Sequence, residues 1–259
     1  MTKIAFIDAP RATKYWGDGL LNRVESNLVA EALSNLGVDV EIATWYEDND
    51  WEKFSHLIVR TPSDVYFYAD EFLSWLESVS AKTKILNTAN IIKWNLDKHY
   101  LGEFIKAGVN VAPTSYIEVG ETFSTNYSDY VVKPVTSGGG ANSGRFSQDQ
   151  VEEARELISR IHNLGVAAIV QPYLTSVDER GEIDLVFFNE VFDHAIIKGP
   201  VLKKNVTEEF HEEYHPNPQP YTPSSEEILL AEKALSISPT TEKLLHARID
   251  MATDNNGNP

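Results

Sequence analysis

Residues 130–144 read YVVKPVTSGGGANSG, an apolar stretch with one lysine that runs into a glycine-rich loop. The pattern predicts a strand over Tyr130 to Val135, followed by a loop over Ser137 to Gly144. Glycines let successive backbone N–H groups converge on an anion, and the preceding Lys133 adds positive charge. The loop lacks the lysine of the P-loop pattern G-x-x-x-x-G-K, and a flexible hairpin tip has the same composition. The segment is therefore either an anion-binding loop or a hairpin tip.

Two lysines near this loop are candidates for contact with phosphate. Lys133 lies in an otherwise apolar strand, where a charge is costly to bury without a partner. It is either paired with a carboxylate or directed at a phosphate. Lys98 follows Asp97 at the start of a helix that we expect to run to Ala107.

Downstream of the loop, the sequence predicts mainly strands. Ser147 and Gln150 have the spacing of a capping box at the start of a helix. Alternation and turn residues predict four strands, over 167–173, 183–188, 191–197 and 245–252, and the second and third of them form a predicted hairpin across Asn189-Glu190. A polar, proline-rich surface loop is expected over 203–223 and a helix over 224–235.

Two of these predicted strands carry residues suited to nucleotide chemistry. Arg248 and Asp250 lie two positions apart, so both side chains face the same side of a strand. An arginine can hold developing phosphoryl charge while a carboxylate holds Mg²⁺, although a salt bridge has the same spacing. A predicted strand ends at Gln171-Pro172-Tyr173-Leu174, where the backbone becomes irregular. This segment either presents main-chain groups to an adenine ring or is an ordinary strand end.

The N-terminal part alternates strands and helices. Predicted strands over 3–8, 38–43, 56–60 and 84–87 enclose predicted helices, one with an apolar stripe at Leu21, Val24, Leu28, Ala32 and Leu36, and one over 69–79. Strands separated by helices predict a parallel sheet covered on both faces. A dinucleotide site is disfavoured, because Asp8-Ala9-Pro10-Arg11 stands where G-x-G-x-x-G would follow the first strand.

The composition limits the possible partners. The chain of 259 residues has 39 acidic against 22 Lys and Arg residues, a net charge of −17, which disfavours nonspecific binding to nucleic acid or anionic membranes. It contains no cysteine, which excludes disulfides, thiol nucleophiles and Cys-based zinc sites. No apolar run approaches the roughly 18 residues of a membrane span, and the apolar stretch near Met1 is too short for a signal peptide, so we expect a cytoplasmic protein.

A motif of another class occurs at His211-Glu212-Glu213-Tyr214-His215, which fits the zinc-protease pattern H-E-x-x-H. That chemistry needs both histidines on a well-formed helix. Pro216, Pro218 and Pro220 follow at once and stop helix propagation. A solvated loop is the favoured interpretation, with zinc proteolysis as a remote alternative.

Taken in order, six segments resemble the ATP-grasp superfamily, in particular its glutathione-synthetase-like carboxylate–amine ligases. They are residues 94–98, 132–134, 137–144, 171–174, 181–182 and 247–250. Residues 94–100, 113–114 and 187–200 are similar to the branch that contains the O-ureido-serine cyclo-ligases of cycloserine biosynthesis.

The resemblance implies an α/β (α+β) ATP-grasp fold with an N-terminal parallel α/β domain over 1–90, a central subdomain with the glycine-rich lid over 91–170, and a C-terminal antiparallel subdomain over 171–259. The resemblance also implies roles for individual residues. ATP would be held by Lys98 and Lys133 at its phosphates, by Ser137, Gly138, Gly139 and Gly140 closing over the phosphates, by Gln171, Tyr173 and Leu174 around the adenine, and by Glu182. Arg248 would stabilise phosphoryl or acyl-phosphate oxygens, Asp250 would bind Mg²⁺ (or Mn²⁺), and Lys198 and Arg60 would contact substrate.

The implied reaction is attack of a substrate carboxylate on the γ-phosphate of ATP, followed by displacement of phosphate from the acyl phosphate by an amine. The substrate is a small amino-acid or peptide-like molecule, and a homodimer is compatible with the resemblance. The alternative within the same fold is a nucleotide-binding relative without catalysis. Asn256-Gly257 is a hairpin signal with no return strand, so this end is either a frayed tail or a hairpin that lacks its last strand. The resemblance places further metal ligands on that strand, so we expect the 1–259 chain to be inactive or its natural form to be longer.

Overall fold

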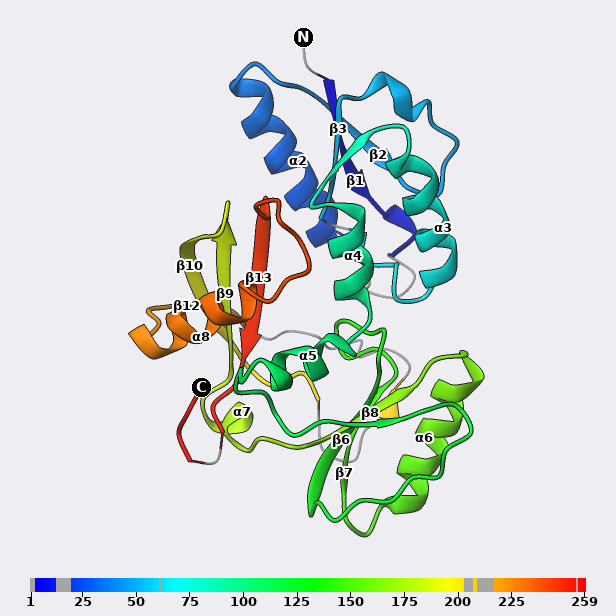
Figure 1. Cartoon of the computed structure of the whole chain (residues 1–259), viewed down its shortest axis with the longest axis vertical. Helices are drawn as coiled ribbons and strands as arrows, with labels where there is room; N and C mark the ends of the chain where they lie inside the picture. Colours follow the sequence, from blue (N-terminus) through cyan, green and yellow to red (C-terminus); the bar gives the residue numbers. More distant parts are fainter. Residues whose placement is uncertain (1–2, 13–19, 61, 203–206, 209–216, 255) are drawn as a thin grey trace. The chain divides into compact units, whose positions relative to one another are not determined.

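A computed structural model of the chain (Figure 1) describes residues 3–12, 20–60, 62–202, 207–208, 217–254 and 256–259. The chain divides into two compact units, Met1–Leu96 with Thr240–Glu242 and Asp97–Pro239 with Lys243–Pro259. Among the described helices, none combines the length and apolar character needed to cross a membrane.

The first unit contains a parallel sheet, as the alternating sequence pattern predicts. Its four strands are β1 (Lys3–Asp8), β2 (Asp39–Thr44), β3 (His56–Val59) and β4 (Lys84–Leu86), in the order β2-β1-β3-β4. The helices are α2 (Leu20–Asn35), α3 (Ala69–Ser80) and α4 (Ala89–Leu96), with short 3-10 turns η1 (Pro10–Ala12) and η2 (Trp51–Lys53).

Apolar side chains cover both faces of this sheet. Phe72 of α3 belongs to the core on one face, and Val29 and Leu33 of α2 pack against the core on the other. The apolar stripe expected on α2 points elsewhere, because Val24 and Leu28 are 45% and 62% exposed. Val29 and Leu33, one position beyond Leu28 and Ala32, pack against the core of the sheet instead.

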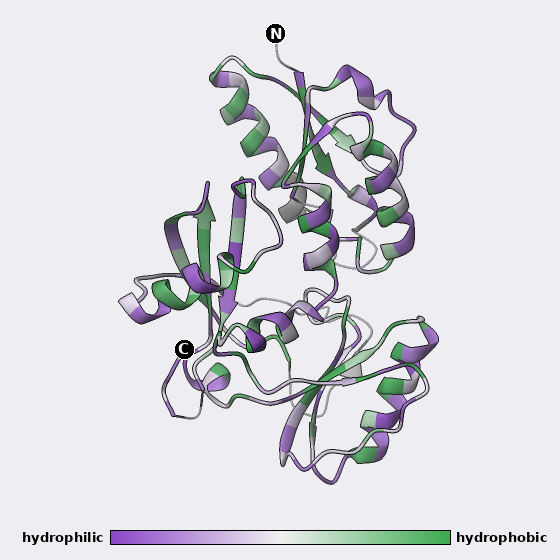
Figure 2. Cartoon of the chain, in the orientation of Figure 1, coloured by the Kyte–Doolittle hydropathy of each residue, from purple (hydrophilic) through white to green (hydrophobic). Residues whose placement is uncertain are grey.

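The second unit contains an antiparallel sheet around the glycine-rich loop. Its strands are β5 (Ser115–Ile117), β6 (Asp129–Pro134), β7 (Ser143–Ser147), β8 (Ala168–Pro172) and β11 (Thr207–Glu208), in the order β11-β7-β6-β8-β5. Helix α5 (Tyr100–Lys106) precedes them, and α6 (Val151–Asn163) buries Leu157 and Ile161 in the core of this sheet. Figure 2 shows α6 alternating between hydrophobic and hydrophilic residues, as expected of a helix with one buried face.

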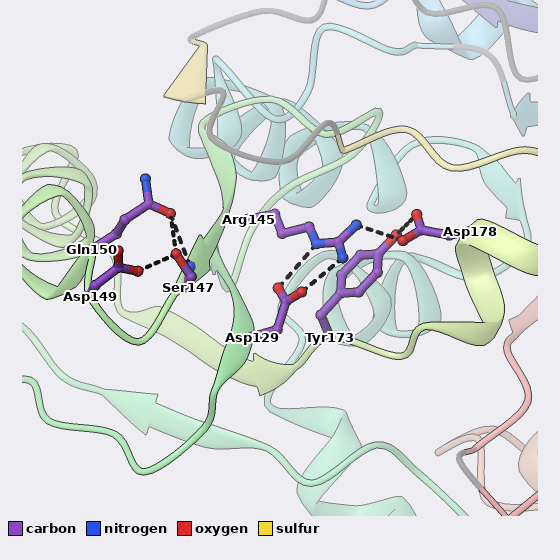
Figure 3. A network of polar contacts seen from close by, with 7 residues as sticks. All are labelled: Asp129, Arg145, Ser147, Asp149, Gln150, Tyr173 and Asp178. Carbon is purple, nitrogen blue, oxygen red and sulfur yellow. Dashed lines mark hydrogen bonds and ion pairs between the residues drawn. The ribbon is translucent and has the colours of Figure 1, made fainter.

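The helix predicted downstream of the loop forms as α6, but the prediction of a capping box at its start is wrong: Gln150 is the residue before α6 and makes no side-chain cap. Its side-chain oxygen instead accepts hydrogen bonds from the backbone N–H and the hydroxyl of Ser147, at 3.0 and 2.9 Å (Figure 3). Strand β7, which lies between the loop and this helix, is an element that the sequence did not predict; its residues Gly144 to Ser147 pair with β6 and are extended.

A second antiparallel sheet of the same unit has the order β12-β10-β9-β13. Its strands are β9 (Glu182–Phe188), β10 (Val191–Lys198), β12 (Gln219–Tyr221) and β13 (His246–Met251). The predicted hairpin across Asn189 and Glu190 forms, and both residues have positive φ (53° and 65°), as a tight two-residue turn requires. Strand β12 lies in the segment expected to be a loop, where it pairs with β10. Short helix α7 (Ser176–Glu179) precedes β9, and α8 (Ser225–Leu235) packs Ala231 into this sheet's core.

Ser224 is expected to stabilise α8 measurably. Its hydroxyl accepts from the backbone N–H of Glu227, whose carboxylate accepts from the backbone N–H of Ser224, which completes a capping box. Ser224→Ala should therefore lower the free energy of unfolding by about 1 kcal/mol in urea melts. Ser236→Ala at the other end of α8 is the control, since its hydroxyl only donates to the carbonyl of Lys233. Equal losses in the two variants would contradict the role of the cap.

Candidate active site

Strand alternation in the second sheet places charged residues on one face. Lys198 of β10 pairs with Glu182 of β9, and Asp250 of β13 pairs with Asp184. Directly paired residues face the same side, and residues two apart do too, so Arg248 joins this face. The intervening residues of β9, Ile183, Leu185 and Phe187, belong to the apolar core on the opposite face. The prediction that Arg248 and Asp250 share a face is confirmed.

Lys198 lies in the middle of this charged face. Its Nζ is 2.7 Å from Glu182 Oε1, 2.8 Å from Asp184 Oδ2 and 3.9 Å from Asp250 Oδ2. Lys198 and Asp184 are buried, with exposures of 7% and 1%. Burial favours the neutral form of Lys198, but the carboxylates of Asp250, Glu182 and Asp184 outweigh it and raise the lysine pKa above its ordinary value. Burial, followed by repulsion from Asp250, raises the pKa of Asp184 to about 6.

Arg248 and Asp250 form the salt bridge that the sequence left open as an alternative. Arg248 Nε is 2.6 Å from Asp250 Oδ1, and Arg248 Nη2 is 2.7 Å from Asp250 Oδ2. This bidentate pair, together with the nearby carboxylate of Asp184, raises the pKa of Arg248 further above its usual value. The Arg248 side chain is still 54% exposed, so a ligand can reach it while the ion pair persists.

The carboxylates of Glu182, Asp184 and Asp250 fit a divalent cation. One oxygen of each lies within 4.8 Å of the others, and carboxylate oxygens are the ligands that Mg²⁺ prefers. Within the described part of the chain, Asp184 Oδ1 is buried without a hydrogen-bond partner, as an oxygen awaiting a cation would be. Sequence reasoning named Asp250 alone as the metal ligand and missed Asp184, although the alternation Glu182-Ile183-Asp184 placed both acids on one face.

Lys98 and Lys133 lie near each other beside the glycine-rich loop. Lys98 Nζ donates to the carbonyl oxygen of Ser137, and its backbone N–H donates to Val135 at 3.0 Å. Burial, followed by the positive charge of Lys133, lowers the pKa of Lys98 to about 7. Burial also lowers the pKa of Lys133, which is opposed by the charge of Glu182. Among the described residues no ion pair joins Lys133 to a carboxylate, which disfavours the interpretation that Lys133 is paired and favours the one in which it is directed at a phosphate.

The glycine-rich loop joins the antiparallel strands β6 and β7. Gly139 and Gly140 have φ of 58° and 78°, which residues with a side chain rarely adopt. Two turn hydrogen bonds of 3.1 Å, from Ala141 N–H to the carbonyl of Gly138 and from Ser143 N–H to that of Gly140, shape the loop. The loop is therefore the tip of a β-hairpin, and a hairpin tip of this kind is compatible with anion binding by its backbone N–H groups.

At the end of β8, the side chains of Gln171 and Tyr173 are held by protein groups. Gln171 Nε2 donates to Thr114 Oγ1 at 2.8 Å, and the Tyr173 hydroxyl donates to Asp178 Oδ1 at 2.5 Å. Arg145 lies over the Tyr173 ring, with 3.4 Å between its guanidinium carbon and the ring centroid (Figure 3). Among the described groups, the backbone N–H of Leu174 has no hydrogen-bond acceptor.

Two further sequence predictions fall outside this cluster. Arg60 belongs to the first unit, where its Nε donates to Glu25 Oε1. The H-E-x-x-H motif at His211–His215 lies outside the described residues. Sequence analysis also missed Arg145, Asp129 and Asp178, which meet only through strand pairing and helix placement.

Comparisons with known proteins identify relatives of this chain. Residues 12–87 match the family model described as "D-cycloserine synthetase DcsG, N-terminal domain". The cycloserine biosynthesis protein DcsG of Streptomyces lavendulae is 32% identical over 188 residues, which are 68% of this chain and 63% of that protein. The chain thus spans less than two thirds of this relative's length.

Solved structures share the fold. A crystal structure of D-cycloserine synthetase DcsG has a TM-score of 0.87 and 26% identity, covering 99% of this chain and 89% of that chain. D-alanine–D-alanine ligase from Bacillus anthracis complexed with ATP has a TM-score of 0.69 and 12% identity, covering 98% of this chain and 83% of that chain. A RimK domain ATP-grasp protein from Sphaerobacter thermophilus has a TM-score of 0.64 and 16% identity, covering 99% of this chain and 88% of that chain. The chain has the α/β ATP-grasp fold that its motifs predict, and its sequence is similar to that of the cycloserine biosynthesis protein DcsG.

Proposed function

We propose that this protein is an ATP-dependent ligase that activates a substrate carboxylate as an acyl phosphate for attack by an amine. One observation carries the proposal: lysines with lowered pKa values beside a glycine-rich loop occur in the same unit as a cluster of carboxylates with an exposed arginine. The first group suits an anion and the second suits a cation, and a nucleotide triphosphate with its divalent metal offers both.

The site residues take the following roles in this proposal. Lys98 and Lys133 neutralise the phosphates, and the backbone of Ser137–Gly140 closes over them. The side chains of Gln171 and Tyr173 fix the segment in which the Leu174 N–H is available to the adenine ring, and Glu182 lies at the nucleotide. Arg248 stabilises charge on the transferred phosphoryl group, and Lys198 neutralises charge on the substrate side.

Asp250, Asp184 and Glu182 are the residues proposed to hold Mg²⁺ or Mn²⁺. When bound, the cation offsets negative charge on the phosphates. The expectation that the metal site is incomplete rested on Asp250 as its single ligand. Asp184 and Glu182 add two carboxylates from β9 to this face.

The proposed reaction balances in two steps. A carboxylate oxygen of the substrate bonds to the γ-phosphorus while the bond between that phosphorus and the bridging β–γ oxygen breaks, and ADP leaves. The amine nitrogen then bonds to the acyl carbon, inorganic phosphate leaves, and the amine loses a proton. Positioning and charge neutralisation carry most of the acceleration in such phosphoryl transfers.

The substrate class proposed is a small amino-acid derivative, and the similarity to D-cycloserine synthetase supports a cyclised amide as one product. A cytoplasmic location, a homodimer and the three-part division at residues 90 and 170 are further parts of the proposal that rest on the sequence.

The central test is ADP formation that depends on an amino acid with a free carboxylate. Hydroxylamine added to the assay should trap the acyl phosphate as a hydroxamate, and amino acids with a blocked carboxylate should give neither product. Lys133→Met should weaken ATP binding by about tenfold, because it removes a charge on the phosphates. The exposed Lys243→Met is its control. ATP binding without any hydroxamate would favour the non-catalytic alternative.

Lys98 should make ATP binding depend on pH. With its pKa lowered to about 7, Lys98 is mostly neutral at about pH 8 in the free protein, whereas neighbouring phosphates favour its charged form. ATP binding at about pH 8 should therefore take up about one proton, and affinity should fall as pH rises above 7. Calorimetry in buffers of different ionisation enthalpy measures this uptake. Lys98→Met should abolish it and Lys106→Met should retain it; uptake that survives Lys98→Met would contradict the assignment.

The carboxylate cluster should bind Mn²⁺ in the absence of nucleotide. Asp250→Asn should lower the affinity for Mn²⁺ by about tenfold or more, because it removes one carboxylate ligand. Paramagnetic relaxation of water protons measures the affinity. Asp193→Asn, an exposed position on β10 of the same sheet, is the control. Equal Mn²⁺ affinity in the two variants would place the cation elsewhere.

A further inference from the structure

Arg145 is a buried cation that no step of the proposed reaction uses. It lies on β7, two residues after the strand begins at the end of the glycine-rich loop, and it is 7% exposed. Its Nε and Nη2 donate to the two carboxylate oxygens of Asp129 at 3.0 and 2.8 Å, and its Nη1 donates to Asp178 at 2.8 Å (Figure 3). A buried guanidinium is tolerated because both carboxylates compensate its charge. Bonds to Asp129 are the first cause of its raised pKa.

Tyr173 is held by the same network from two directions. The guanidinium stacks on one face of its ring at 3.4 Å, and its hydroxyl donates to Asp178, the carboxylate that also accepts from Arg145. The backbone N–H of Tyr173 donates to the carbonyl of Asp129 at 3.0 Å. The ring, the hydroxyl and the backbone of Tyr173 are therefore all fixed by residues that contact Arg145.

The network joins three parts of the second unit that lie far apart in the sequence. Asp129 begins β6, which enters the glycine-rich loop, and Arg145 lies on β7, which leaves it. Tyr173 follows β8, and Asp178 belongs to α7. One guanidinium thus ties the base of the loop hairpin to the segment that contains Leu174. None of these contacts reaches Leu174 directly, so any effect on a ligand there passes through Tyr173.

We propose that Arg145 is a positioning residue for adenine recognition: it fixes Tyr173 and Asp178 so that the Leu174 backbone faces the base. This inference rests on the proposed function, because it assumes that the nucleotide base binds at residues 171–174. A merely structural Arg145 would support the fold without distinguishing one part of the nucleotide from another. The inference therefore predicts a loss confined to ligands that carry the base.

The test compares three probes, namely ATP, AMP and inorganic tripolyphosphate, by calorimetry on the full chain. Arg145→Met should weaken ATP and AMP by about tenfold, the size typical of coupled contacts, and leave tripolyphosphate within about twofold. Lys133→Met should show the opposite pattern, with tripolyphosphate weakened and AMP retained. Arg155→Met is the matched control, since Arg155 makes an exposed pair with Glu152 on α6, and it should bind all three probes as the native chain does.

Two milder variants keep the inference testable if Arg145→Met does not fold. Tyr173→Phe removes the hydroxyl bond to Asp178 but keeps the stacked ring, and Arg145→Lys keeps the charge but loses the planar, bidentate contact. Both should weaken AMP while circular dichroism shows a folded chain. Unchanged AMP affinity in folded variants, or equal weakening of AMP and tripolyphosphate, overturns this inference alone. Failure of the native chain to bind ATP instead contradicts the proposed function.

Discussion

The ion pair between Lys198 and the buried carboxylate of Asp184 is the contact on which the polar face of the second sheet depends. Without Lys198 the buried carboxylate of Asp184 would lose its nearest compensating charge, and an uncompensated buried charge costs about 3–5 kcal/mol. Strand alternation forces the arrangement: the neighbours of these residues pack into the apolar core against α8, which leaves one face for all the charged side chains. The ammonium group of Lys198 therefore holds the carboxylates of this face in the positions that the proposed metal site requires.

The lysines beside the glycine-rich loop are buried positive charges without a carboxylate in an ion pair among the described residues. Burial lowers the pKa of both Lys98 and Lys133, and the positive charge of Lys133 lowers the pKa of Lys98 further. An arriving anion would stabilise the charged forms and recover part of that cost. In the proposed function, a chain with a net charge of −17 binds a polyphosphate because its positive charge is concentrated where burial makes it most responsive to an anion.

Local sequence patterns predict the elements better than they predict the contacts between them. The strands of the first unit, the hairpin at Asn189-Glu190 and the shared face of Arg248 and Asp250 follow from periodicity and turn chemistry, and the structure confirms them. Strand β7 was missed because its residues, Ser143 to Ser147, lack the apolar alternation that marks a strand; cross-strand pairing with β6 decides its conformation. Asp184 was visible by spacing, but its role depends on Lys198, which is distant in the sequence.

The carboxylates of the second sheet and the lysines beside the glycine-rich loop also affect one another electrostatically. Asp250 acts on Lys98 and Glu182 acts on Lys133, each raising the pKa of a lysine that burial lowers. A cation bound by the carboxylates would cancel part of this support and make the lysines harder to protonate, unless an anion arrived with it. A polyphosphate without its metal would meet the repulsion of Glu182 and Asp250. In the proposed function, these charges therefore favour binding of metal and polyphosphate together over binding of either alone.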